Sequence, residues 1–153
     1  MTSPRQIYFL CKNGHTVGNA TKCCVLHIGS RNIKHKYFMD KDHTLGLKTV
    51  ESEKDVGVTF SENLKFDIHI NNIVKKGNQV LGMIKRSFTY IEEERFTILF
   101  KSMVRPHLEY ANAIWHPAYK RQMKANENVQ RRATKILPEI RDLTYADTLR
   151  HLN

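Results

Sequence analysis

Acidic side chains are the first place to look for catalytic chemistry, because two-metal phosphoryl transfer needs carboxylates that bridge both ions. The 153-residue chain contains no pair of adjacent aspartates. Asp40 and Asp42 flank a lysine in an expected turn. Glu92–Glu94 lie in the first turn of an expected helix, where they interact favourably with the helix dipole. No catalytic residue is therefore predicted.

The segment Tyr145–Thr148 imitates the start of the Tyr-x-Asp-Asp turn of nucleic-acid polymerases. It lacks the second aspartate, and it lies where the apolar spacing is typical of a helix. We therefore interpret it as the beginning of a helix and not as a metal-binding turn.

Five potential metal ligands lie close together near the N-terminus: Cys11, His15, Cys23, Cys24 and His27. None has the Cys-x2-Cys spacing of a closed zinc site, and no glycine-rich phosphate loop occurs. No metal, cofactor or small-molecule substrate is predicted. Three cysteines with an adjacent pair form a poor disulfide framework, which favours a reducing, intracellular compartment without deciding between nucleus and cytoplasm.

The charge balance points to a polyanionic partner. Lysine and arginine number 25 against 15 acidic residues, so the formal net charge is +10. Such an excess on a small chain favours nucleic acid over a membrane surface, although a basic surface without a partner is the alternative. No apolar stretch approaches the ~20 residues that cross a bilayer, so no membrane partner is expected.

The most specific physical signal is a helix expected over 121–137, which Pro138 ends. At 100° per residue one stripe is positive: Arg121, Lys124, Arg131, Arg132 and Lys135. A nearly opposite stripe is apolar: Met123, Val129, Ala133, Ile136 and Leu137. Lys85 and Arg86 add to the positive charge. This pattern suits binding to a phosphate backbone, with salt-sensitive and nearly sequence-independent affinity. A solvated face or a membrane-surface helix are the alternatives.

The elements that position these residues change in type along the chain. Short strands are expected at 7–10, 23–28, 37–39, 45–50 and 56–60. The run 23–28 is apolar throughout and ends at Gly29, which is typical of a buried strand. From 66 to 88 the apolar residues recur at helical spacing. Gly77 lies on that apolar face, which suggests close packing against another element.

Several more helices follow. Thr89 and Glu92 form an expected capping box, and Pro106 should break or restart the second helix. A short helix is expected over 108–115, and Thr144 with Asp147 begins the last one. The fold class is α+β, with short strands or hairpins in the N-terminal third followed by a bundle of about five helices. The expected boundaries are an unassigned segment 1–20, strands over 21–60 and helices over 61–153.

Five segments, in this order and spacing, resemble the reverse transcriptases of non-LTR (LINE-type, jockey-like) retrotransposons. They are Thr21–Gly29, Glu53–Val58, Val80–Arg86, Arg105–Ala111 and Val129–Lys135. The similarity covers 21–153.

The resemblance implies that 22–29 is the palm strand after the catalytic turn and that 54–60 belongs to the primer-grip hairpin. Val56-Gly57 stands where a Leu-Gly pair is usual. Residues from about 62 onward would form the thumb, which holds the template–primer duplex. In that family the catalytic aspartates precede the strand that begins near Lys22, and residues 1–20 do not resemble the palm. The chain is therefore not expected to be an RNA-directed DNA polymerase on its own.

The expected function is that of a reverse-transcriptase fragment that retains nonspecific binding to an RNA–DNA or DNA duplex. The residues expected to bind are Lys85, Arg86, Arg121, Lys124, Arg131, Arg132 and Lys135, with Val56 and Gly57 at the primer-grip-like hairpin. Two alternatives remain: the chain is a piece of a full RNA-directed DNA polymerase, or it is a translated relic without a selected function. No oligomeric state is indicated.

Overall fold

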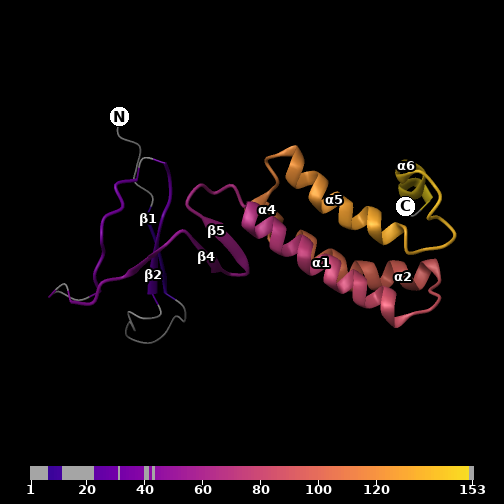
Figure 1. Cartoon of the computed structure of the whole chain (residues 1–153), viewed down its shortest axis with the longest axis horizontal. Coiled ribbons are helices and arrows are strands. Elements are labelled where there is room, and N and C mark those ends of the chain that lie inside the picture. The colour runs from indigo at the N-terminus through magenta and orange to yellow at the C-terminus, as the bar shows by residue number, and fades with distance from the viewer. Residues whose placement is uncertain (1–6, 12–22, 31, 40–41, 43, 152–153) are drawn as a thin grey trace. The chain divides into compact units, whose positions relative to one another are not determined.

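The protein divides into two compact units, a β-rich one over residues 1–66 and a helical one over residues 67–153 (Figure 1). A computed structural model describes residues 7–11, 23–30, 32–39, 42 and 44–151, and it describes residues 7–11, 149 and 151 by their backbone alone. The predicted α+β class, with short strands preceding helices, is confirmed.

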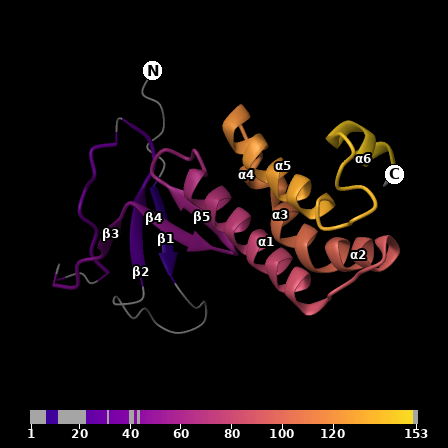
Figure 2. The same ribbon diagram turned by 45° about the vertical axis from the view of Figure 1, so that its right-hand side comes forward.

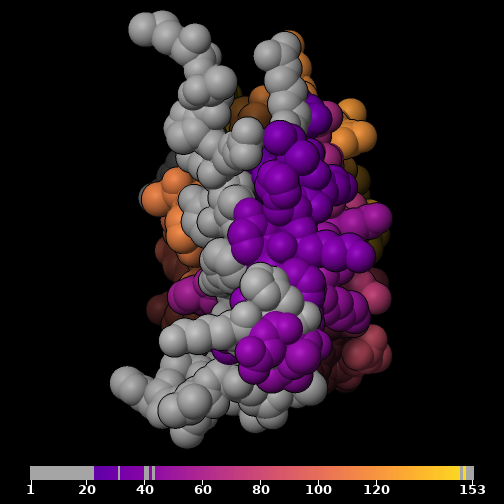
Figure 3. Space-filling view, turned by 90° about the vertical axis from the view of Figure 1, so that its left-hand side faces the viewer, coloured from indigo at the N-terminus to yellow at the C-terminus, as the bar shows by residue number. Residues whose placement is uncertain are grey.

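The first unit contains a three-stranded sheet in the order β1 (Ile7–Cys11), β2 (Cys23–His27), β3 (Lys48–Val50). The central strand β2 pairs antiparallel with β1 and parallel with β3. All five β2 residues are buried, four of them apolar and the last the polar His27. The predicted buried strand is therefore confirmed. Figure 3 shows one surface of this unit, with described residues in indigo and magenta.

Two of the predicted strands are wrong or too long, and a third, predicted over 56–60, begins two residues later as β5 (Val58–Ser61). Residues 37–39 form no strand, because Phe38 makes a single isolated bridge with Gly46. The predicted strand over 45–50 shortens to β3. Short apolar runs predict strands poorly unless a neighbouring strand offers a continuous ladder of hydrogen bonds.

A separate two-stranded hairpin joins β4 (Ser52–Asp55) to β5 (Val58–Ser61). The apolar pattern did not predict β4, because its residues are polar or charged and show no apolar alternation. The resemblance implied a hairpin over 54–60, and the hairpin that forms begins two residues earlier. Val56 and Gly57 form the two-residue turn, with φ angles of 45° and 80°. This left-handed pair is the turn geometry that suits the twist of a hairpin. Val56, at 74% exposure, is an exposed apolar residue at the tip.

The cysteines differ from expectation. Cys23 is disulfide-bonded, whereas Cys24 is buried and forms no disulfide. The sequence-based interpretation of a poor disulfide framework is therefore wrong for Cys23, and the cysteines no longer favour a reducing compartment. His15 lies outside the described residues. Among the side chains that the structure describes, no three His, Cys, Asp or Glu gather into a metal-binding group.

The second unit begins with α1 (Asp67–Ser87), which confirms the strongest helical pattern of the sequence. The helix buries the predicted apolar positions Ile70, Val80 and Ile84, and the last two belong to the main hydrophobic core of the unit. Phe88 was expected to continue this face, but it follows the helix end and is 45% exposed. The apolar face therefore ends with the helix.

The next helical segment starts later and continues further than predicted. It consists of α2 (Glu93–Leu99), η2 (Phe100–Val104) and α3 (Arg105–Glu109) without a break. The predicted capping box at Thr89 is wrong: Glu92 is the N-cap and makes no side-chain cap bond. The buried side chain of Ile91 fixes the chain just before the helix instead.

Pro106 does not end this helix. A proline inside a regular α-helix has no N–H to donate to the carbonyl four residues earlier, and its ring clashes with that carbonyl. The π-helical turn η2 precedes Pro106, and the Arg105 N–H donates to the Phe100 carbonyl across it. The wider turn absorbs the proline, so the predicted break becomes a change of helix type.

Three helices complete the unit: α4 (Asn112–Trp115), α5 (Lys120–Thr134) and α6 (Tyr145–His151). The basic helix was predicted to reach residue 137, but α5 ends at Thr134 and Leu137 is buried from the turns that follow. None of the helices in the described part of the chain is long and apolar enough to cross a membrane.

The predicted start of α6 is confirmed. The Asp147 N–H donates to Thr144 Oγ1 at 3.3 Å, and the Thr144 hydroxyl donates to Asp147 Oδ2 at 2.6 Å. This reciprocal cap satisfies a backbone donor of the first turn.

Candidate nucleic-acid interface

The two longest helices, α1 and α5, lie side by side and run in the same direction (Figure 2). Arg121 Nη2 lies 2.8 Å from Asp67 Oδ1 where both helices begin. Further along, Arg132 Nη1 donates to Asn78 Oδ1 at 2.9 Å. Because the partners advance together along both helices, the two helices are parallel neighbours.

Gly77 allows the close approach of α1 to the helices packed on it. A Cβ at this position would lie 3.0 Å from Leu108 Cδ2 and 3.5 Å from Val129 Cγ1. The first distance is shorter than ordinary carbon contacts, so no other residue fits without movement. The close packing predicted for Gly77 is confirmed.

A polar cluster pins the beginnings of α1 and α5 together. Asp67 Oδ1 accepts hydrogen bonds from Arg121 Nη2 and, at 2.9 Å, from Gln122 Nε2. Gln122 is 3% exposed, and its Oε1 accepts from the Tyr119 N–H at 3.2 Å. Arg121, one of the predicted binding residues, is therefore paired with a carboxylate, and the positive charge at this end is partly compensated.

The two stripes of α5 are not placed as predicted. Met123 was assigned to the packed stripe, but it is 46% exposed, and Gln122 is buried instead. The buried positions centre on Val129 and Ala133. At 100° per residue the basic stripe lies about a third of a turn from them and not nearly opposite. This smaller angle brings Arg132 to the flank of α1.

Most cations on the exposed side of α5 have no carboxylate partner among the described residues. The partner of Arg132 is the neutral amide of Asn78, whose Nδ2 donates to the Val74 carbonyl. Lys124 and Lys135 are exposed, and no carboxylate in the described part of the chain pairs with them. Compensation by i,i+4 acids, which a purely solvated helix face usually shows, is weak here.

Arg131 occupies the edge of the stripe that faces α6. Its guanidinium lies 4.5 Å from the centre of the Tyr145 ring, and its Nη2 is 3.5 Å from Glu127 Oε1. Burial, with a contribution from Glu127, raises the pKa of the Tyr145 phenol, while Arg131 lowers it. The phenol therefore stays protonated at neutral pH and donates to Gln130 Oε1 at 3.2 Å.

Lys85 and Arg86 are exposed in the last turn of α1. Lys85 follows Asn78 by seven residues, or about two helical turns, so it lies on the same flank of α1. A Cβ at Gly82 would lie 3.5 Å from Arg86 Nη1, which places the guanidinium over the preceding turn. Both residues extend the positive surface along α1.

We call this surface the basic seam. It consists of the exposed flanks of α1 and α5 and contains Asn78, Lys85, Arg86, Arg121, Lys124, Arg131, Arg132 and Lys135. Asn78 was not predicted, because the predicted binding surface was defined by charged residues alone. The seven-residue spacing of Asn71, Asn78 and Lys85 is a signal that could have found this flank. Val56 and Gly57 belong to the hairpin of the other unit, so the seam is formed by the helical unit alone.

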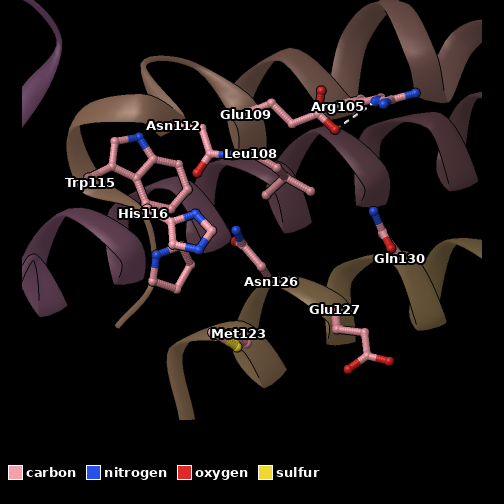
Figure 4. A pocket seen from close by; sticks show the side chains of 11 residues that line it. Arg105, Leu108, Glu109, Asn112, Trp115, His116, Met123, Asn126, Glu127 and Gln130 are labelled. Carbon is pink, nitrogen blue, oxygen red and sulfur yellow. Dashed lines mark hydrogen bonds and ion pairs between the residues drawn. The ribbon is translucent and has the colours of Figure 1, made fainter. Parts of the chain in front are cut away.

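The opposite side of α5 borders a groove of about 290 Å³ against α3 and α4 (Figure 4). Trp115 lies against it from α4, and Asn126 and Gln130 face it from α5. The groove has mixed charge, because Arg105 Nε pairs with Glu109 Oε1 at 2.7 Å and Glu127 also lines it. It is therefore a poor site for a polyanion.

Comparisons with protein-family models, curated proteins and solved structures found no match for this chain. The resemblance to reverse transcriptases therefore stays a prediction. The functional argument rests on the geometry and charge of the basic seam.

Proposed function

We propose that the helical unit binds nucleic-acid duplexes without sequence specificity, through phosphate contacts along the basic seam. The observation that supports this is the alignment of cations along two parallel helices, with Lys124, Arg132 and Lys135 uncompensated by the carboxylates that the structure describes. A smooth helical surface of this kind reaches phosphates and does not read base edges.

The size of the seam suits a duplex backbone. The 15 residues of α5 span about 22 Å at 1.5 Å per residue. Phosphates on one strand are spaced about 3.4 Å along the duplex axis, so α5 covers about six of them. Long, mobile lysine and arginine side chains reach several of these groups without a fixed register.

The resemblance extends this proposal. As a thumb-like piece, the helical unit would hold an RNA–DNA template–primer duplex, and the turn at Val56 and Gly57 would be the primer-grip-like element. In this proposal the chain binds the duplex and does not itself polymerise nucleotides. A nucleic-acid partner inside the cell is consistent with the net charge of +10.

Fluorescence anisotropy with labelled duplexes tests the proposal. We expect the full chain to bind an RNA–DNA hybrid and a DNA duplex of unrelated sequence with similar affinity at low salt. The logarithm of the affinity should fall linearly with the logarithm of salt concentration, with a slope of roughly −3 to −5 for four or five phosphate contacts.

A matched pair of variants locates the contact. Lys124→Gln removes a charge from the seam and should reduce the salt slope by about one. Lys76→Gln removes another exposed charge, from α1. Lys76 lies about 200° around the helix from Asn78, so this variant should bind the duplex normally. Absence of binding at low salt, salt-independent binding or equal losses in both variants would contradict the proposal.

A further inference from the structure

A second concave site lies beyond the C-terminal end of α5. A pocket of about 270 Å³ is enclosed by the last turn of α5, the turns that follow it and the beginning of α6. Its charged lining residues are Arg131, Lys135 and Arg141, and no carboxylate lines it. Arg141 was not singled out by the sequence pattern, because it lies outside α5.

This charge distribution differs from that of the two other pockets described in the helical unit. Glu109 and Glu127 line the groove beside α3 and α4. Asp67 lines the pocket at the beginnings of α1 and α5, where it binds Arg121. The pocket beside α6 is therefore suited to an anion, whereas the other two contain their own countercharges.

The cations of this pocket are weakly compensated. Arg131 Nη2 is 3.5 Å from Glu127, and Arg141 Nε is 3.7 Å from Asp142 Oδ1. Both distances exceed that of a strong charged hydrogen bond, and exposed pairs of this kind contribute little. Lys135 has no carboxylate partner among the described residues. All three side chains can therefore turn toward an anion at small cost.

The wall of the pocket is more firmly held than its cations. The Tyr145 ring lies under the Arg131 guanidinium and its hydroxyl donates to Gln130 on α5. Thr148 is buried, and its hydroxyl donates to the Thr144 carbonyl at 2.9 Å. The Tyr145 contacts hold the start of α6 against α5, and the Thr148 bond stabilises the first turn of α6, so the pocket exists before any ligand binds.

We propose that this pocket binds a phosphomonoester, such as the phosphate at the 5′ end of a nucleic-acid strand. A phosphomonoester carries a charge of about −1.5 to −2 at neutral pH, which three cations match better than they match a singly charged phosphodiester. A terminal phosphate can also enter a concave site, whereas phosphates within a duplex meet the exposed seam. The pocket shares Arg131 and Lys135 with the seam, but it can bind a phosphomonoester even if the seam binds no duplex.

The first experiment compares one blunt DNA duplex in its 5′-phosphorylated and 5′-hydroxyl forms, by anisotropy with the full chain. We expect the phosphorylated form to bind about tenfold more tightly, as a doubly charged group in contact with several cations should. Titration calorimetry with adenosine monophosphate and with inorganic phosphate tests the pocket without a duplex. Binding of adenosine monophosphate alone indicates a nucleotide end, and binding of both indicates recognition of the phosphate group.

Variants separate the pocket from the seam. Arg141→Gln should remove the preference for the phosphorylated end while leaving the affinity for the 5′-hydroxyl duplex unchanged. Arg141→Lys should retain most of the preference, and Lys124→Gln should weaken both duplexes equally. Equal affinity of the native chain for both ends, together with no binding of either small phosphate, would overturn the proposal. A preference that survives in the Arg141→Gln variant would also overturn it.

Discussion

The two long sides of α5 differ in how the charges beside them are paired. On the groove side, Arg105 and Glu109 are one turn apart on α3 and bind each other at 2.7 Å. On the seam side, Arg132 meets the neutral Asn78 across the helix pair. Whether a surface is positively charged therefore depends on the group that each cation faces, and not only on the number of cations.

The groove side also carries more of the packing. Trp115 is 1% exposed, and its indole N–H donates to the Tyr110 carbonyl at 2.6 Å. Its ring meets that of His69 edge to face at 5.3 Å between centroids. We propose that the groove side of α5 maintains the fold and that the seam side binds the nucleic-acid duplex. Four predictions test this difference between the two sides.

The largest effect is expected at Trp115. Trp115→Ala removes a fully buried ring and should lower the free energy of unfolding by about 3–5 kcal/mol, measured by urea denaturation. Trp115→Phe keeps most of the ring volume but removes the indole N–H that donates to the Tyr110 carbonyl, so it should cost roughly 1–3 kcal/mol. A folded Trp115→Ala variant with normal stability and lost duplex binding would place the binding site on the groove side.

The second-largest effect is expected where α1 packs against its neighbours. Gly77→Val forces side-chain atoms into the space of Leu108 and Val129, and should lower the free energy of unfolding by roughly 1–3 kcal/mol. Gly82→Ala is the control, because its Cβ would meet an exposed arginine at an ordinary distance. It should stabilise by up to about 1 kcal/mol through helix propensity. Similar losses in both variants would show that close packing at Gly77 is unimportant.

Neutralising the seam should affect binding and not stability. The combined variant Lys124→Gln, Arg132→Gln and Lys135→Gln should bind a DNA duplex at least about tenfold more weakly at low salt, because three phosphate contacts are lost. Its unfolding midpoint should stay close to that of the native chain, since exposed polar contacts contribute little. Unchanged affinity at low salt would argue that the seam is an ordinary solvated surface.

The smallest effect is expected from the matching change on the groove side. Arg105→Gln breaks the exposed pair with Glu109 and should change stability by no more than about 0.5 kcal/mol. Duplex affinity, measured under the same low-salt conditions, should change by less than about twofold. If this variant binds as weakly as the seam variant, the two sides of α5 do not differ in function.

Much of the fold follows from local patterns. The buried strand β2, the apolar face of α1 and the cap at Thr144 were predicted because each depends on residues within a few positions of one another. The apolar pattern did not predict β4, since its charged residues gain their hydrogen bonds from β5 and not from a pattern of their own. Pro106 was mispredicted because a π-helical turn can absorb a proline, and no local signal announces such a turn.

The cations of the candidate site were predicted, but Asn78 and the pairing of the cations were not. The charges of α5 are visible in its sequence, whereas the bond from Arg121 to Asp67 joins residues far apart in the chain. Whether a cation is compensated therefore depends on contacts that no local spacing contains.

Helical periodicity is a local property, so the sequence alone was enough to predict that α1 and α5 are helices and that α5 has a positive stripe. The parallel direction of these helices, the packing of Gly77 against Leu108 and Val129, and the bond between Asn78 and Arg132 follow from the tertiary structure. The orientation of a helix about its axis is set by the side chains packed around it. Those neighbours come from distant parts of the chain, and they turned a predicted stripe on one helix into a surface shared by two.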